Sequence, residues 1–120
     1  MIPTDIKLHR RSRVLVIAFA DGQQFELPCE LLRVRSPSAE VQGHGHGQWV
    51  VPTGKESVNI TRIEPVGQYA VRLTFDDGHN TGLYAWDYLY DLGAQRERYW
   101  TEYLAALDQL GYARTPPATL

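Results

Sequence analysis

An internal repeat sets the main limit on how this chain can fold. The stretches VLVIAFADGQQFELPCELL and YAVRLTFDDGHNTGLYAWDYL begin at Val14 and Tyr69 and share a Phe-x-Asp-Gly core at residues 19–22 and 75–78. Val, Ile, Phe and Tyr favour strands, and the Asp-Gly pair supplies the positive φ angles that a two-residue hairpin turn requires. Each copy therefore predicts a strand, a tight turn, a second strand and a short helix.

A further strand precedes each copy, because TDIKL at 4–8 resembles TRIEP at 61–65. The sequence thus predicts an α+β fold, mainly antiparallel β-sheet, built from two repeated strand-hairpin-helix units. Between the units, WVVP at 49–52 is a candidate for a short extra strand.

The last periodic segment predicts a C-terminal helix. Its large apolar residues recur at spacings of three and four, which places them on one helical face. These residues are Trp100, Tyr103, Leu104, Leu107 and Leu110. Gly111 marks the end of the helix. The segment that follows has two consecutive prolines and no periodicity, so we expect one domain over 1–112 and a disordered tail over 113–120.

Composition excludes several classes of protein. A chain of 120 residues can bury a core without disulfides, and its single cysteine, Cys29, indicates a reducing compartment. We see no export or membrane segment, so the expected location is the cytoplasm, without a membrane partner. The net charge of −2 argues against nucleic acid as a partner. We interpret the basic residues of the first hairpin as its solvated rim. They are Lys7, Arg10, Arg11 and Arg13.

The histidines are the candidate metal ligands. His44 and His46 alternate with glycines in GHGHG at 43–47, and two imidazoles at this spacing converge on a metal only if the loop folds back. A zinc ion needs four ligands, normally including Cys, a third His or a carboxylate. His79, at the exit of the second hairpin beside Asp76, offers a third imidazole. Two alternatives stay open: the loop histidines are simply exposed, and His79 merely occupies a turn.

Motifs of the common enzyme classes are missing. The sequence has no phosphate-binding glycine loop followed by Lys, no nucleophile elbow and no His-x-Asp iron motif. We therefore expect a protein that is not an enzyme. Cys29 corresponds to Ala85 in the second copy, which favours a buried packing position over a reactive thiol. Trp86, Tyr88 and Tyr90 either seal the core or form a surface that binds a protein partner.

Several of these segments together resemble a known family. The repeat, LLRVRSPSAEVQGHG, GKESVNITRIEPVGQYAVRLTFDDGHNTGLYAWDYLYDLG and the final helix are similar to the gamma-butyrobetaine hydroxylase-like N-terminal domain, over about residues 4–112. This domain is found in bacteria as a small stand-alone protein of unknown function. In the carnitine-pathway hydroxylases it precedes the catalytic domain that uses 2-oxoglutarate and iron. A similar domain follows some Mrp-type P-loop ATPases that transfer iron–sulfur clusters. We expect neither catalytic domain in this chain, so neither activity transfers.

The resemblance also implies the position of a metal centre. The hydroxylases bind a structural zinc through three cysteines and one histidine, and these positions fall on Ser36, Ser38, Val41 and His79 here. A neutral hydroxyl does not replace the charge and softness of a thiolate, so we expect this zinc site to be absent. If the glycine-rich loop packs near His79, a three-histidine site with His44 and His46 replaces it, with zinc or iron as the metal.

Two hypotheses for the function therefore remain open. In the first, the chain is a non-catalytic accessory domain that binds metal or takes part in iron–sulfur protein maturation. In the second, it is a protein–protein interaction module that docks on a larger enzyme without any metal. The docking surface is then the aromatic surface around Trp86, Tyr88 and Tyr90, together with the glycine-rich loop. Binding of single-stranded nucleic acid ranks below both because of the slightly acidic charge.

Overall fold

The structure, a computed structural model, describes residues 1–42 and 49–116. In the first unit, β1 (Pro3–His9), β2 (Val14–Phe19) and β3 (Gln24–Pro28) form an antiparallel sheet in that order. The chain then enters α1 (Cys29–Val34) and, after a short link, α2 (Ala39–Gln42).

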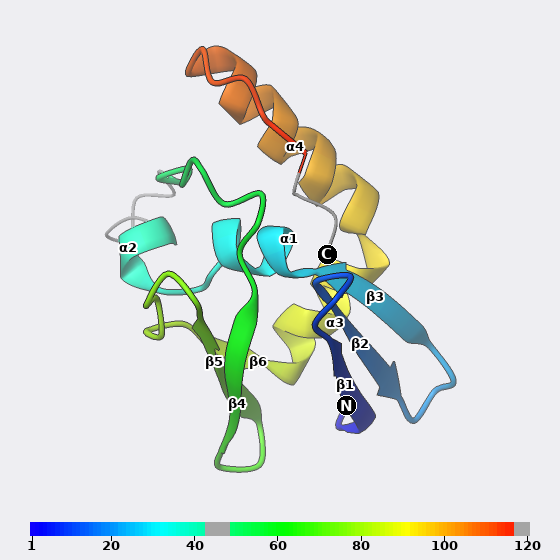
Figure 1. Cartoon of the computed structure of the whole chain (residues 1–120). Coiled ribbons are helices and arrows are strands. Elements are labelled where there is room, and N and C mark those ends of the chain that lie inside the picture. The colour runs from blue at the N-terminus through cyan, green and yellow to red at the C-terminus, as the bar shows by residue number, and fades with distance from the viewer. Residues whose placement is uncertain (43–48, 117–120) are drawn as a thin grey trace.

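The second unit has the same order of elements. Strands β4 (Ile60–Val66), β5 (Ala70–Phe75) and β6 (Leu83–Ala85) form the second antiparallel sheet and lead into α3 (Trp86–Ala94). Helix α4 (Arg96–Gln109) follows. The predicted α+β fold with two repeated strand-hairpin-helix units and a C-terminal helix is confirmed (Figure 1). The short helix α2 has no counterpart in the sequence prediction.

Both Phe-x-Asp-Gly turns depend on their glycine, with φ of 88° at Gly22 and 92° at Gly78. In the first turn, the Gly22 N–H donates to the Phe19 carbonyl at 3.0 Å, and the Phe19 N–H donates to the Gln23 carbonyl at 2.8 Å. This is a three-residue turn, in which only the glycine takes the left-handed conformation. The prediction of a two-residue turn with positive φ at both Asp and Gly is therefore wrong.

The main core lies where the two sheets and α3 meet (Figure 1). Alternate residues of the two central strands point into it, as the period of a half-buried strand requires. They are Leu15, Ile17 and Phe19 of β2 with Leu73 and Phe75 of β5, each at most 3% exposed. Cys29 is also buried, and its burial raises the pKa of the thiol to about 11. This environment agrees with a packing role rather than a reactive one.

Helix α4 extends away from the two sheets (Figure 1). Tyr103 and Leu107 are buried in a second apolar cluster with residues of α1, whereas Leu104 and Leu110 are 41% and 61% exposed. Only part of the predicted apolar stripe is thus packed against the rest of the protein. Gly111, with φ of 71°, follows the end of the helix as predicted. In the described part of the chain, no helix combines the length and apolar character that crossing a membrane requires.

The segment 49–52 is not a strand, so the prediction of an extra strand there is wrong. Trp49 is anchored by its side chain instead. Its indole Nε1 donates to the Val34 carbonyl at 2.8 Å, and the Arg35 guanidinium lies 3.5 Å from the centroid of its ring. These contacts tie the segment to the end of α1.

Two buried carboxylates hold the chain after α4, namely Glu30 of α1 and Glu56 in the segment before β4. Arg114 donates to both oxygens of Glu30, at 2.5 and 2.8 Å, and the Tyr103 hydroxyl donates to Glu30 at 2.6 Å. The Thr115 N–H donates to Glu56 at 2.9 Å. Residues 113–116 of the predicted tail thus include two that make hydrogen bonds. Disorder of the tail stays a prediction for 117–120, which lie outside the described residues.

Candidate functional site

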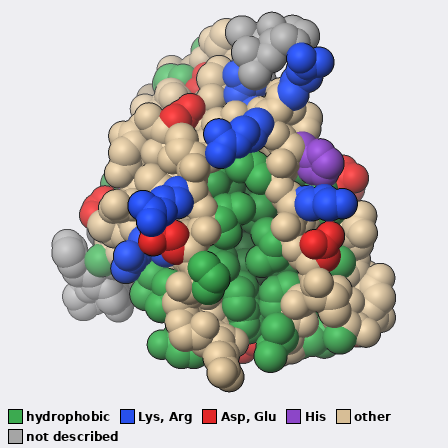
Figure 2. All heavy atoms as spheres, turned by 60° about the horizontal axis from the view of Figure 1, so that its bottom comes forward, with side chains coloured by type: hydrophobic (Ala, Val, Ile, Leu, Met, Phe, Trp, Pro, Cys, Tyr) green, Lys and Arg blue, Asp and Glu red, His purple; other side chains and the backbone are tan. Residues whose placement is uncertain are grey.

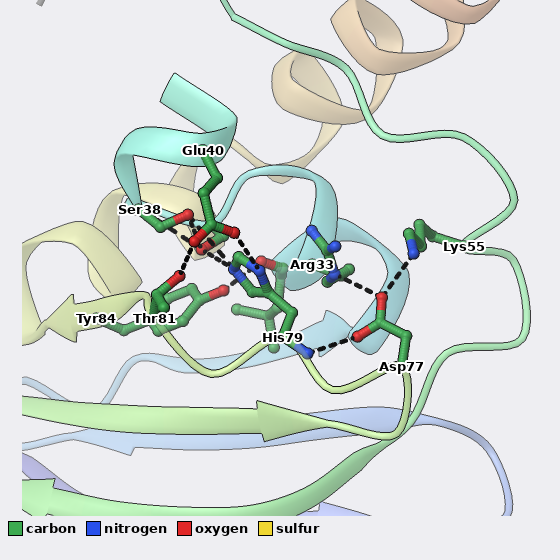
Figure 3. A network of polar contacts seen from close by, with 10 residues as sticks. Arg33, Ser38, Glu40, Lys55, Asp77, His79, Thr81 and Tyr84 are labelled. Atoms are coloured by element: carbon green, nitrogen blue, oxygen red, sulfur yellow. Dashed lines mark hydrogen bonds and ion pairs between the residues drawn. The ribbon is translucent and has the colours of Figure 1, made fainter. Parts of the chain in front are cut away.

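The turn between β5 and β6 directs His79 toward the link between α1 and α2 (Figure 3). The Asp77 carboxylate accepts the backbone N–H of His79 at 3.0 Å, and the Phe75 N–H donates to the His79 carbonyl at 2.9 Å. Both bonds fix the backbone on either side of the imidazole. The backbone from which the imidazole projects toward the first unit is therefore held in place.

The imidazole meets two buried serines. His79 Nε2 lies 2.8 Å from Ser36 Oγ and 3.4 Å from Ser38 Oγ, and the two hydroxyl oxygens are 3.3 Å apart. The other ring nitrogen, Nδ1, lies 3.4 Å from a carboxylate oxygen of Glu40. We call His79, Ser36 and Ser38 the His–Ser cluster. It joins the two units of the repeat and is almost entirely buried, with exposures of 8%, 0% and 6%.

Close packing on the β6 side closes the His–Ser cluster. A Cβ atom placed on Gly82 would lie 2.3 Å from Ser36 Oγ, so only glycine leaves room for the serine here. The fully buried Tyr84 donates its hydroxyl to the Leu32 carbonyl at 2.5 Å. Thr81 donates to Glu40 at 3.1 Å and holds that carboxylate beside the imidazole.

An ionic group adjoins the cluster. The Asp77 carboxylate accepts from Arg33 Nε at 2.8 Å and from Lys55 Nζ at 2.6 Å (Figure 3). Burial alone raises the pKa of Asp77, but hydrogen bonds from Lys55, the His79 backbone and Arg33 outweigh it and hold this pKa well below its ordinary value. Burial, followed by the positive charge of Arg33, lowers the pKa of His79, and the carboxylates of Glu40 and Asp77 do not reverse this. The imidazole is therefore neutral at neutral pH.

Acidification is expected to destabilise the protein through His79. Because the folded state lowers the pKa of His79 below the ordinary value of 6.5, protons bind preferentially to the unfolded chain. The contribution of His79 to the free energy of unfolding is complete above pH 6.5 and falls as the pH drops below this value. Urea unfolding between about pH 7 and pH 5 should thus give a falling free energy of unfolding. His79→Gln should reduce this slope. Equal slopes in wild type and His79→Gln would contradict the assignment.

The order of hydroxyl, imidazole and carboxylate in Ser36, His79 and Glu40 is that of a hydrolase triad. A nucleophile must reach the carbon it attacks, but Ser36 has no exposed surface. The packing of Gly82 on its oxygen leaves no room for a substrate carbonyl. This geometry suits a structural hydrogen-bond network and does not support acyl transfer.

The zinc centre implied by the family resemblance does not fit these residues. Ser36 and Ser38 do lie against His79, as the resemblance places them, and Val41 is buried nearby in α2. Two neutral hydroxyls and a valine supply no thiolate. Within residues 1–42 and 49–116, no three His, Cys, Asp or Glu side chains are grouped to hold a metal. His44 and His46 lie outside the described residues, so the three-histidine site stays a prediction.

The aromatic residues proposed to bind a partner make contacts inside the protein. Trp86 donates its indole N–H to the Gln68 carbonyl at 2.8 Å, and the Tyr88 hydroxyl donates to the Arg35 carbonyl. Tyr90 donates to Asp21 at 2.6 Å and packs edge-on against the rings of Phe19 and Phe25. The three side chains are half-buried and help to hold α3 in place. Whether they also contact a partner stays a prediction.

A second candidate site is an apolar groove between the two sheets. In Figure 2 apolar side chains form a continuous, hollowed band, and charged side chains of both signs lie along its sides. β1 and β4 are edge strands of their sheets. Ile6 and Leu8 of β1 pair with Ile17 and Leu15, whereas Ile63 and Pro65 of β4 pair with Leu73 and Val71. Paired residues share a face of the sheet, so all four edge residues lie on the core side. We call Ile6, Leu8, Ile63 and Pro65 the edge groove.

The sequence contains one signal of the edge groove that was not used. In DIKLH and TRIEP the apolar residues alternate with polar ones, which is typical of strands with one apolar face. What alternation does not reveal is that both strands lie at sheet edges, where their apolar face is only partly covered.

The fold and the His–Ser cluster define a small α+β domain in which two repeated units are joined by a buried polar network. The chain belongs to the family described as gamma-butyrobetaine hydroxylase-like, N-terminal, which it matches over residues 6–90. The resemblance seen in the sequence is thereby confirmed.

Three solved structures are similar to this chain. Two NMR solution structures are 55% and 46% identical to it, each covering 99% of this chain and 89% and 94% of their own, with TM-scores of 0.83 and 0.82. The third is a crystal structure from Acidithiobacillus ferrooxidans, described as a protein with unknown function that belongs to the DUF971 family. It is 43% identical and covers 77% of this chain and 92% of its own, with a TM-score of 0.65. A search of curated proteins found no match.

Proposed function

We propose that this chain is a non-catalytic module that binds a protein partner through the edge groove, without a metal. The observation that carries the proposal is the apolar band of Figure 2, which lies open between two edge strands. Contiguous apolar surface rimmed by polar side chains is typical of protein-binding sites. The His–Ser cluster, in contrast, is closed to solvent and offers no surface to a ligand.

The groove differs from the aromatic surface expected from the sequence. Ile6, Leu8 and Ile63 are half-buried and make no polar contact through their side chains, whereas Trp86, Tyr88 and Tyr90 each use their polar atom within the protein. Binding at the groove thus buries apolar surface without first breaking an internal hydrogen bond.

Two matched double variants test this function. The groove variant Ile6→Gln/Ile63→Gln makes the band polar, and the control Leu83→Gln/Leu110→Gln changes two exposed apolar residues elsewhere. Each immobilised protein is incubated with an extract of the source cells, and retained proteins are measured by quantitative mass spectrometry. A protein retained by wild type is then purified and its affinity is measured by calorimetry. We expect the groove variant to bind at least about 10-fold more weakly and the control to bind normally. Unchanged affinity of a folded groove variant contradicts the proposal.

The metal-linked alternative is tested by titration of the wild-type protein. Because Ser36, Ser38 and Val41 are poor zinc ligands, we expect no binding of zinc or iron(II) tighter than about 10 μM under anaerobic conditions. Near-stoichiometric metal that disappears in His79→Ala would instead support a site with His44 and His46. That result would favour the metal or iron–sulfur hypothesis over the proposed function.

A further inference from the structure

We infer that the free edge of β1 binds an extended, acidic segment of the partner protein as an additional strand. This inference rests on the proposed function and names the chemistry of the partner. It follows from three features of the edge groove, namely the direction of the backbone groups, the position of Pro65 and the charge of the first hairpin.

Among the described residues, none is paired with the backbone N–H and C=O groups of two residues of β1. Phe19 donates to the Gln23 carbonyl and the Cys29 N–H donates to the Arg13 carbonyl, so odd-numbered residues of β2 face β3. Hydrogen bonds of an antiparallel strand alternate between its two neighbours, so the even-numbered residues of β2 face β1. Their partners in β1 are Asp5, Lys7 and His9. Ile6 and Leu8 consequently direct their N–H and C=O groups away from β2, toward the open edge.

The opposite wall of the groove is less suited to pairing. The Trp86 N–H donates to the Tyr69 carbonyl and the Phe75 N–H donates to the His79 carbonyl, so odd-numbered residues of β5 face β6. By the same alternation, the backbone groups of Ile63 and Pro65 in β4 point away from β5, toward the open edge. Proline has no N–H to donate, and proline at an edge is a common protection against strand addition. β1 is therefore the edge that accepts a strand, and β4 supplies an apolar wall.

One end of the groove, away from Pro3, is closed by hydrogen bonds. At this end, the Asn59 amide donates to the Arg10 carbonyl at 2.9 Å and Arg10 donates to the Thr61 carbonyl at 3.5 Å. These bonds join the turn after β1 to the start of β4 and close that end.

The charges of residues 1–13 indicate which kind of peptide segment binds at this edge. Residues 1–13 contain one acidic residue, Asp5, and four basic residues. The basic residues are Lys7, Arg10, Arg11 and Arg13. In an added strand, alternate side chains point to opposite faces, so one set contacts Ile6, Leu8 and Ile63. The other set lies on the face that Lys7 shares with Asp5. The complementary segment alternates apolar and acidic residues.

The test uses the full chain and two synthetic peptides, acetyl-EVEVEVE-amide and acetyl-KVKVKVK-amide. Backbone amide NMR spectra are recorded during each titration, up to about 2 mM peptide. We expect the acidic peptide to shift the amide signals of Ile6 and Leu8 and to slow their hydrogen exchange, with weaker binding at high salt. The lysine peptide should bind at least about 10-fold more weakly.

Charge variants supply the matched control. Lys7→Glu/Arg11→Glu should weaken binding of the acidic peptide at least about 10-fold. Arg96→Glu/Arg98→Glu makes the same change of net charge on α4 and should leave binding unchanged. Equal loss in both variants would mean a general charge effect and would overturn the inference.

Other outcomes are equally decisive. The inference is overturned if the acidic peptide causes no shift at Ile6 and Leu8, or if both peptides bind alike. Concentration-dependent shifts of these residues without peptide would show a second copy of this chain as the occupant and would also overturn it. The proposed function is tested separately: it is rejected if Ile6→Gln/Ile63→Gln leaves the affinity for the partner unchanged.

If that variant no longer binds the partner but no strand pairing is seen at β1, the proposed function still holds and only the inference is rejected.

Discussion

The triple variant Ser36→Cys/Ser38→Cys/Val41→Cys is expected to bind one zinc ion with a dissociation constant near or below about 1 nM. In wild type, Ser36 Oγ and Ser38 Oγ lie 2.8 and 3.4 Å from His79 Nε2 and 3.3 Å from each other. Ligand atoms around a tetrahedral zinc are about 3.5–3.8 Å apart, so small shifts bring sulfur and nitrogen atoms into place. The wild-type fold thus brings three of the four ligand positions close together, while its hydroxyls lack the charge to hold the ion.

Affinity is measured by competition with a chromophoric chelator under reducing conditions, and cobalt(II) absorption reports the ligand geometry. Adding His79→Ala to the triple variant removes the nitrogen ligand and should weaken binding at least about 10-fold. Zinc should also raise the melting temperature of the triple variant and leave that of wild type unchanged. A folded triple variant that binds zinc no better than wild type would show that Val41 or the backbone is misplaced for coordination.

Glu30→Ala is expected to lower the free energy of unfolding by about 3 kcal/mol. The Glu30 side chain is 6% exposed and that of Arg114 is 26% exposed. The substitution removes the carboxylate that both Arg114 and the buried Tyr103 hydroxyl contact. An unpaired cation and an unpaired hydroxyl then remain in a partly dry environment. Burial, followed by the hydrogen bond to Glu30, raises the pKa of Tyr103, which agrees with a low-polarity environment around its hydroxyl.

Urea denaturation measures this loss. The control Glu97→Ala removes an exposed carboxylate of α4 and should change stability by less than about 0.5 kcal/mol. Comparing Glu30→Ala, Arg114→Ala and the double variant gives the coupling energy of the pair. A loss below about 1 kcal/mol for Glu30→Ala would mean that Arg114 and Tyr103 find other partners.

Local sequence signals predicted most of the fold. The repeated Phe-x-Asp-Gly core placed both hairpins, and the glycines at 22 and 78 take positive φ as the turns require. The turn type was wrong because a three-residue turn and a two-residue turn both favour glycine after Asp. Leu104 was placed on the buried face because helical spacing gives the direction of a side chain but not the extent of the surface that covers it.

The sites were less predictable because they depend on contacts between the units. His79 was identified from its position after the turn, and the family resemblance brought Ser36 and Ser38 beside it. Glu40 was not identified as its neighbour, since α2 is a short helix without a periodic pattern. The edge groove was missed because the pattern of a strand does not tell which of its edges remains unpaired.

The bond between Glu30 and Arg114 joins residues 84 positions apart. During translation, α1 is complete long before the arginine that neutralises its carboxylate leaves the ribosome. A chain that stops short of Arg114 contains both repeat units and yet carries a buried charge without its partner, so it unfolds more readily and is more accessible to proteases. The contact of Arg114 with Glu30 thus makes folding sensitive to truncation before this residue.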